Sequence, residues 1–442
     1  MLRIAIRLFV FICILFNLFL GLLALQDMQD ETKFLAALAL ISFFGSLLCL
    51  IRIARVSDPI SLRNLRIILA VLICSPLISY GLWSNIGRLS EPITKPAFVG
   101  DSQALKQTVV VPTLEAPLPQ DKNVIWCASL QLAWDRLKED AVGEPVKIKG
   151  AEELVDKLNS GEFPANVIEK ESYYAAAGWK KDGVVAKIQG EMKAKFPDVV
   201  PDLSGSADTA VIAYAYLKAG LKFSIPYFEN REPFEFKDSS GKSTHVSSFG
   251  IREEDAYAYY KMREQIKVLH LLREGNSRKL LEFALDLDRN SKPYQVVIAR
   301  LEPKINLRQT LEYLDEKVKA GVKDAYSGEF NDFGSKFGIN EVFLVPNINL
   351  DITRRFGELE GPDKPLLNPK CAGLWLGLVQ QRIQFKLDRS GAEVASALKL
   401  LMRPMPRYFI FDKPFLVYLK KRDSNIPFFV MWVNNAELLC KP

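Results

Sequence analysis

The chain has 442 residues, of which 49% are hydrophobic and 25% charged, and its formal net charge is +6 at pH 7. This length can bury a sizeable core and suggests about two or three units. The positive charge is spread along the chain, without a basic block that alternates with aromatic residues, so nucleic acid is not an expected partner.

Three apolar stretches open the chain, at 4–25, 34–50 and 67–83. Each is close to the length of about 20 residues that a helix needs to cross the hydrocarbon core of a bilayer. A cleaved signal peptide is the alternative for the first stretch, but that stretch lacks a small-x-small cleavage site and two more stretches follow it. We therefore expect a bundle of three transmembrane helices over residues 1–83, with the lipid bilayer as a partner.

Charges in the short loops predict the orientation of these helices. The loop between the first and second stretches is acidic, whereas arginines lie at the start of the chain and between the second and third stretches: Arg3, Arg7, Arg52, Arg55, Arg63 and Arg66. Basic loops stay in the cytoplasm, so the N-terminus is expected there and everything after residue 83 is expected outside, in the periplasm or the extracellular space. No acid or histidine lies in the middle of a stretch, which favours an anchor over a transport path.

Residues 84–121 are rich in proline, which fixes φ and removes a hydrogen-bond donor, so we expect an extended linker there. Within it, 107–114 could add an edge strand. The exported domain is then expected to cover 122–442, beginning with a strand that leads into a helix at 123–140.

Helices are expected first in this domain and strands later. Two more helices are predicted at 150–161 and 171–196, and a further helix at 306–321 has Asn306 as its N-cap and Gly321 just past its end. A short helix is expected after residue 352. Runs with period-two or β-branched character predict strands at 209–223, 232–236, 243–251, 265–272, 280–288, 294–301, 341–352, 379–388, 408–421 and 426–435. Helices followed by strands indicate an α+β domain rather than alternating βαβ units.

The C-terminal residues resemble the end of a serpin. In serpins a strand with an Asp/Asn-Arg/Lys-Pro-Phe motif is followed by a hairpin and a final apolar strand. The corresponding residues are Phe411, Asp412, Lys413, Pro414 and Phe415, followed by 428–435.

Upstream of this motif, residues 391–397 are similar to the serpin hinge, in which a glycine, a small residue and a glutamate lead into alanines. Val394 and Ser396 stand where alanine is usual, and the residues that fit are Gly391, Ala392, Glu393, Ala395 and Ala397. Two weaker matches lie in 123–134, with Cys127 in place of a serine, and around Tyr216, Leu217 and Lys218. Together the four matches span residue 122 to the end.

This resemblance implies a serpin-like domain with a large mixed β-sheet, helices packed on it and a C-terminal β-hairpin. In inhibitory serpins the loop after the hinge presents a cleavage site to a protease and, once cut, inserts as a new strand in the middle of that sheet. Small residues are needed because the strand slides between two strands that are already paired. A serpin is not an enzyme, so the resemblance implies no catalytic residue and no cofactor.

The loop of this chain departs from the inhibitory pattern. It is about half a dozen residues shorter than an inhibitory loop, which is a shortfall of about 20 Å at a rise of about 3.3 Å per residue. Two prolines, which cannot donate to a β-ladder, fall inside the candidate exposed segment. The candidate loop or protease-contact residues are Met402, Arg403, Pro404, Met405 and Arg407.

Three functions remain open at this point. The first is a membrane-anchored, non-inhibitory serpin-like module that binds a protein partner. The second is a serine or cysteine protease inhibitor that presents Arg403 or Arg407, and the third is an enzyme with a site that no motif reveals. His245 and His270 stand alone without other residues at metal-ligand spacing, so no metal is expected. Any disulfide pairing among Cys127, Cys371 and Cys440 stays open.

Overall fold

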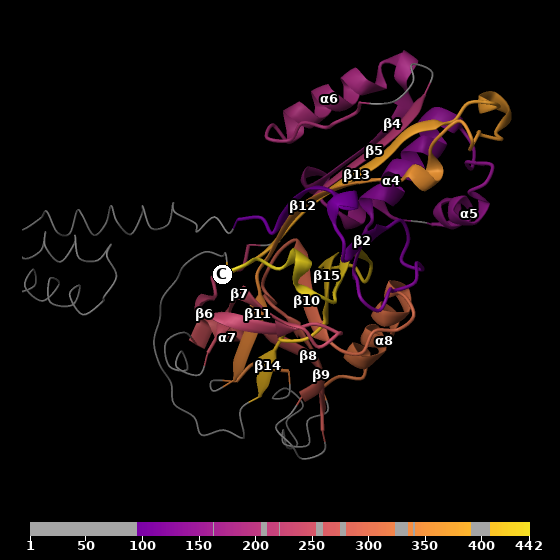
Figure 1. Cartoon of the computed structure of the whole chain (residues 1–442). Coiled ribbons are helices and arrows are strands. Elements are labelled where there is room, and N and C mark those ends of the chain that lie inside the picture. The colour runs from indigo at the N-terminus through magenta and orange to yellow at the C-terminus, as the bar shows by residue number, and fades with distance from the viewer. Residues whose placement is uncertain are drawn as a thin grey trace, which may run out of the picture. The chain divides into compact units, whose positions relative to one another are not determined.

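Three β-sheets form the framework of the part of the chain that the computed structural model describes (Figure 1). The described residues are 95–161, 163–204, 210–220, 222–252, 260–274, 280–322, 335–338, 341–389 and 407–442. They belong to one compact unit, Thr94–Pro442. The three expected membrane spans lie outside these residues, and within them no helix has the length and apolar character needed to cross a bilayer.

The first sheet has five strands of mixed direction, which agrees with the expected mixed sheet. Its order is β1 (Phe98–Asp101), β12 (Ile348–Arg355), β13 (Leu376–Leu387), β5 (Val211–Gly220) and β4 (Tyr173–Trp179). The pairs β1–β12 and β13–β5 are parallel, and the pairs β12–β13 and β5–β4 are antiparallel. The last strand before the hinge, β13, therefore lies in the middle of this sheet.

The second sheet has seven strands and contains the C-terminal hairpin near its centre. Its order is β2 (Thr108–Val111), β3 (Asn123–Cys127), β16 (Pro427–Val433), β15 (Phe415–Lys421), β10 (Tyr294–Arg300), β9 (Leu280–Asp286) and β8 (Lys267–Arg273). The rings of Phe385 in β13 and Phe429 in β16 stack with centroids 4.4 Å apart. This contact joins the five-stranded and seven-stranded sheets through the main core.

The third sheet has four strands, in the order β14 (Tyr408–Ile410), β11 (Val342–Pro346), β7 (Ser243–Ile251) and β6 (Phe228–Lys237). Gly250 in β7 has φ +157°, and a Cβ atom there would lie 1.9 Å from the carbonyl oxygen of Phe343. Only glycine allows this close approach of β7 to β11.

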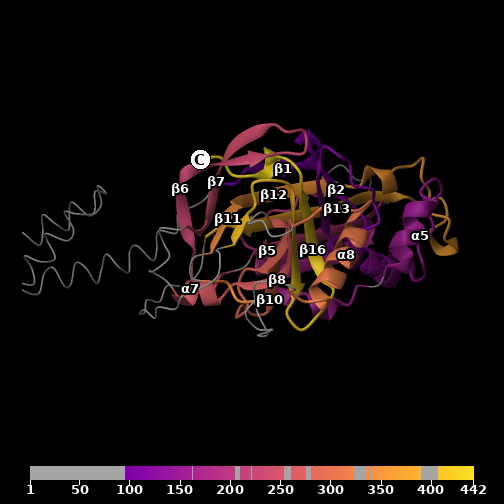
Figure 2. The same cartoon turned by 90° about the horizontal axis from the view of Figure 1, so that it is seen from below.

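In the described part of the chain, the sheets are accompanied by five α-helices: α4 (Ser129–Arg136), α5 (Glu152–Ser160), α6 (Val184–Lys195), α7 (Tyr260–Glu264) and α8 (Leu307–Lys319). Successive side chains of β5 point to opposite faces of the five-stranded sheet and pack in turn against α4 and α6. The two helices therefore cover opposite faces of this sheet. α8 lies against the seven-stranded sheet (Figures 1 and 2). The predicted cap is confirmed, since Asn306 accepts a hydrogen bond from the Gln309 N–H at 2.9 Å.

The sequence prediction was wrong about two helices within the domain. Residues 171–196 were expected to be one helix, but their first part is β4, because pairing with β5 outweighs the helix propensity of three alanines. The helix expected after residue 352 is absent from the described residues there. Instead β12 continues to Arg355, and a short 3₁₀ turn follows at Gly357–Leu359.

The segment expected to be a linker contributes two strands. β1 adds to the edge of the five-stranded sheet, and the Ala97 N–H already donates to Asn349 O at 2.7 Å. β2 is the edge strand predicted within 107–114, and it pairs with β3. Residues 98–111 therefore belong to the folded unit, because exposed sheet edges are available to receive them.

Candidate functional site

The segment 390–406 carries the candidate hinge and most of the candidate loop, and the structure describes both of its attachment points. On the first side, β13 ends at Leu387 and Arg389 closes the described chain. The Tyr227 N–H donates to Arg389 O at 3.0 Å, and Arg389 Nε donates back to Tyr227 O at 3.2 Å. These two bonds hold the chain in place up to Arg389, the last described residue before the hinge.

Next to this attachment point, β13 and β5 pair directly. Their parallel register runs from Leu376 opposite Val211 to Lys386 opposite Gly220, so no strand separates them over that length. A chain that reversed its direction after β13 and entered between them would be antiparallel to both. Antiparallel pairing is somewhat more stable per residue than parallel pairing. The sheet therefore has no gap between β13 and β5. A strand inserted between them would have to break their hydrogen bonds.

The second attachment point is Arg407, which is only 5% exposed. Its guanidinium forms an ion pair with Glu341, in which Nη2 donates to Oε2 at 2.9 Å and Nε donates to Oε1. Nη2 also donates to Lys336 O at 2.6 Å. The main chain is held as well, because the Val342 N–H donates to Arg407 O at 3.2 Å before β14 begins.

Glu341 is fixed by a second set of bonds. The Gly338 N–H donates to Glu341 Oε2 at 2.6 Å. The buried Arg263 donates through Nη1 to Gly338 O at 2.9 Å and to Glu341 O at 2.6 Å. Backbone groups and Arg407 therefore together hold the carboxylate, and the pair anchors the chain at Arg407, where the described residues resume.

This arrangement corrects one of the predicted site residues. Arg407 was expected to be exposed and available to a protease, but it is buried because its charge is neutralised by Glu341. The other predicted loop residues, Met402, Arg403, Pro404 and Met405, and the hinge residues 391–397 lie outside the described residues and stay predictions. No sequence signal marked Glu341, Arg263 or Tyr227, because each contacts residues far away in the chain.

The C-terminal motif, residues 411–415, packs its two phenylalanines in the core and connects two of the sheets. The rings of Phe411 and Phe415 are fully buried, with centroids 5.5 Å apart. Asp412 accepts a hydrogen bond from Arg300 Nη1 at 3.2 Å through its carboxylate and one from the Lys237 N–H at 2.8 Å through its carbonyl. The motif therefore ties β6 of the four-stranded sheet to β10 of the seven-stranded sheet. Lys413 is exposed and Pro414 half-buried.

The remaining candidates have ordinary packing roles. His270 Nε2 lies 3.5 Å from Glu282 Oε2, and in the described residues no group of three or more His, Cys, Asp or Glu is placed to hold a metal. Cys127, Cys371 and Cys440 are all buried and free, which answers the pairing question that the sequence left open.

Several solved structures resemble the chain. One is native protease nexin-1 with heparin, at 10% identity and a TM-score of 0.45, with 71% of this chain and 92% of that chain covered. A second is the mouse protein-Z-dependent protease inhibitor, at 12% identity and a TM-score of 0.46, with 71% and 91% covered. A third is an Arabidopsis serpin in its native stressed conformation, at 13% identity and a TM-score of 0.42, with 72% and 93% covered.

The chain is similar to serpins. The resemblance expected from the sequence is confirmed as a likeness to these serpin structures. No protein-family model matches the chain, and no curated protein sequence matches it. At TM-scores below 0.5 the superpositions support nothing about mechanism, so the function is inferred from the distances and strand order described above.

Proposed function

We propose that the protein is a membrane-anchored, extracytoplasmic serpin-like module that binds a protein partner and does not trap proteases. The observation that carries this proposal is the burial of Arg407 against Glu341. The buried ion pair fixes the chain at Arg407. In an inhibitor, residues 390–406 alone would then have to supply both the cleavage site and the inserted strand.

This segment is too short for both tasks. A strand that fills the sheet beside β13 must match its 12 residues. If the chain needs about 3 residues to reverse after Arg389, the new strand would begin at about residue 393 and end at about residue 404. Only about two residues would then remain before the buried Arg407.

A protease holds its substrate in an extended conformation on both sides of the bond that it cleaves. A bond close to Arg407 does not offer that length, so an accessible bond must lie nearer to Gly391. The part released by such a cut is too short to run the whole length of β13 and carry a tethered protease with it. In addition, Pro404 and Pro406 lack the N–H that a central strand would have to donate.

The inhibitor alternative now depends on Arg403, because Arg407 is buried. Both readings are tested by incubating the full-length chain, in a mild detergent, with a panel of trypsin-like proteases. We expect cleavage within 390–406 without a covalent complex. A complex that survives denaturant would overturn the proposal.

Thermal melting of the cleaved chain gives an independent test. We expect no large rise in the melting temperature after cleavage, because the cut segment cannot complete the sheet. The Arg403→Ala variant is the matched control, since it keeps the loop length and removes one basic cleavage position. A rise of tens of degrees in the cleaved chain alone would mean that the loop inserts.

The membrane part of the proposal is supported by the apolar stretches and the distribution of arginines in residues 1–83. It is tested with a reporter fused after Lys122 that is active on only one side of the membrane. We expect activity outside the cytoplasm and recovery in the membrane fraction. Reporter activity confined to the cytoplasm would contradict the orientation.

A further inference from the structure

Among the strands that the structure describes, β4 forms an edge of the five-stranded sheet and pairs with β5 alone. The Lys180 N–H donates to Ala210 O at 3.0 Å just beyond the strand, and this bond fixes the phase of the pairing. In an antiparallel pair, alternate residues direct both of their backbone groups to the partner strand. The even-numbered residues of β4 therefore bond to β5, and the odd-numbered residues direct their N–H and C=O groups outward.

The outward groups are only partly occupied. Tyr173 O accepts a hydrogen bond from Lys195 Nζ at 2.6 Å, which covers the first position of the edge. For Ala175, which is half-buried, no other described residue supplies a hydrogen-bond partner to the outward backbone groups, whereas Ala177 is only 6% exposed, so the open part of the edge is centred on Ala175. An open sheet edge of this kind is a template for pairing with another chain.

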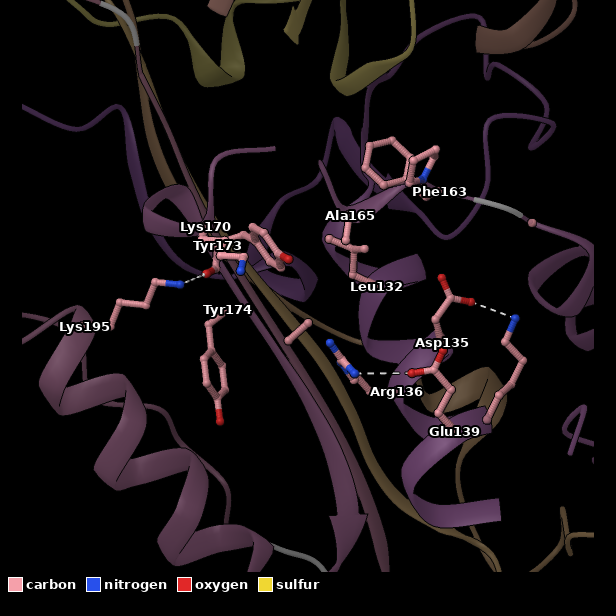
Figure 3. A pocket seen from close by; sticks show the side chains of 14 residues that line it. Leu132, Asp135, Arg136, Glu139, Phe163, Ala165, Lys170, Tyr173, Tyr174 and Lys195 are labelled. Atoms are coloured by element: carbon pink, nitrogen blue, oxygen red, sulfur yellow. Dashed lines mark hydrogen bonds and ion pairs between the residues drawn. The ribbon is translucent and has the colours of Figure 1, made fainter. Parts of the chain in front are cut away.

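A cavity of about 650 Å³ lies beside this edge (Figure 3). Tyr173, Tyr174 and Ala175 line it from β4, and Leu132 and Phe163 contribute apolar groups from the opposite side. A side chain of a strand added to β4 would have space there. The open edge and the adjacent cavity together are the geometry of β-strand addition, in which main-chain bonds provide affinity and side-chain pockets provide specificity.

The charges around the edge indicate the kind of strand that fits. On the helix side of the cavity the charges neutralise each other, because Lys138 Nζ lies 2.7 Å from Asp135 Oδ1 and Arg136 Nη1 lies 3.3 Å from Glu139 Oε2. On the strand side Lys170 and Lys195 flank the beginning of β4, where Figure 3 shows both beside Tyr173. Glu171 also lies close enough to act on Lys195, so these three side chains leave a net positive charge of one.

The far end of β4 is basic as well. Lys180 and Lys181 follow Trp179 directly, and Lys181 Nζ lies 5.2 Å from the centroid of the Trp179 ring. If a second copy of this chain paired antiparallel through β4, the lysines at the start of β4 in one copy would face the lysines at its end in the other copy. Like charges placed opposite each other oppose such a dimer, whereas acidic side chains would be attracted at both ends.

We propose that the β4 edge is a docking site for an extended acidic segment of a partner protein, which adds to the sheet as a sixth strand. In the order of the five-stranded sheet, β5 lies between this edge strand and β13. The proposal deepens the binding function proposed above and rests on it only in assuming that a partner exists.

The test uses the full-length chain and a fluorescent eight-residue peptide that alternates valine and glutamate. We expect this peptide to bind, measured by fluorescence anisotropy, and the peptide with lysine in place of glutamate to bind on the order of tenfold more weakly. A peptide N-methylated at two adjacent central amides, which blocks both of its hydrogen-bonding edges, is expected not to bind.

Variants of the chain locate the site. Ala175→Pro removes one outward N–H and is expected to weaken peptide binding at least about tenfold, whereas Ala175→Ser keeps that N–H and should bind normally. The double variant Lys170→Glu with Lys195→Glu should reverse the preference toward the lysine peptide. Lys187→Glu, an exposed position in α6 outside the cavity lining, is the matched charge control and should leave the preference unchanged.

Three results would overturn the proposal: no binding of the glutamate peptide, normal binding by a folded Ala175→Pro variant, or a dimer in sedimentation that this variant abolishes. Covalent protease complexes are scored in a separate assay. If covalent protease complexes form and the glutamate peptide still binds, only the non-inhibitory function is rejected. If no covalent complex forms and the peptide does not bind, only the docking site is rejected.

Discussion

The guanidinium of Arg407 and the carboxylate of Glu341 form a buried ion pair, with Nη2 and Oε2 2.9 Å apart. Removing one member of a buried pair leaves an uncompensated charge in the interior, which costs about 3–5 kcal/mol. We therefore expect Arg407→Leu to lower the free energy of unfolding by about that amount in urea titrations. The double variant with Glu341→Leu should recover part of the loss, and a loss below about 1 kcal/mol for the single variant would contradict this role.

The stacked rings of Phe385 and Phe429 join the two larger sheets, with centroids 4.4 Å apart and an angle of 30° between the ring planes. Both side chains are buried, so Phe429→Ala should leave a cavity and destabilise the fold by about 3–5 kcal/mol. Phe429→Leu, which keeps much of the volume, should lose less. Denaturant unfolding of both variants checks this order, and equal losses would show that cavity volume does not decide the effect.

Glu282 predicts a pH dependence of stability. The contact with His270 and the hydrogen bond from the Tyr313 hydroxyl at 2.9 Å hold the pKa of Glu282 below its ordinary value of 4.5, against the opposing effect of burial. A carboxyl with a lowered pKa in the folded state contributes stability above pH 4.5 and loses it as the pH falls through the lowered pKa.

The stability advantage of the unchanged chain over Glu282→Gln should therefore shrink as the pH falls below 4.5. Urea unfolding of both proteins at a series of pH values measures this difference, in which the titration of the other carboxyl groups cancels. A constant difference from pH 7 to pH 3 would be inconsistent with the assignment.

Two glycines give a matched pair of backbone substitutions. Gly250→Ala should disrupt the four-stranded sheet, because the new Cβ would meet the Phe343 carbonyl oxygen at 1.9 Å with φ at +157°. Gly190→Ala, inside α6 with no atom within 4 Å of the new Cβ, should instead stabilise the chain by about 0.5–1 kcal/mol. Thermal unfolding separates the two, and similar stability of both variants would mean that β7 and β11 can move apart.

Local signals allowed much of the fold to be predicted from the sequence. The cap at Asn306 and the hairpin of β15 and β16 depend on neighbouring residues, and both are present. Contacts between distant residues were not predictable in this way. Residues 173–179 become a strand because β5 is beside them, and Arg407 is buried because Glu341 stands 66 positions earlier in the chain.

Two predicted strands were divided for a related reason, 341–352 into β11 and β12 and 408–421 into β14 and β15. The run 341–352 has strand-like character along its length, but Asn347 lies between β11 and β12, which enter different sheets. Its side chain donates to Glu229 Oε1 at 2.8 Å and to Ser247 Oγ at 3.1 Å, and both partners come from another part of the chain. Period-two patterning predicts where a strand forms, whereas the choice of sheet depends on such distant partners.

The parallel pairing of β1 with β12 has a mechanical consequence. Any tension that reaches the domain along the chain before Lys95 enters it through four paired residues, Phe98 to Asp101. A pull along the strand axis shears all of these bonds at once, whereas a pull across the sheet opens them one after another. Since β12 is the immediate neighbour of β13, such a load enters the sheet one strand away from β13.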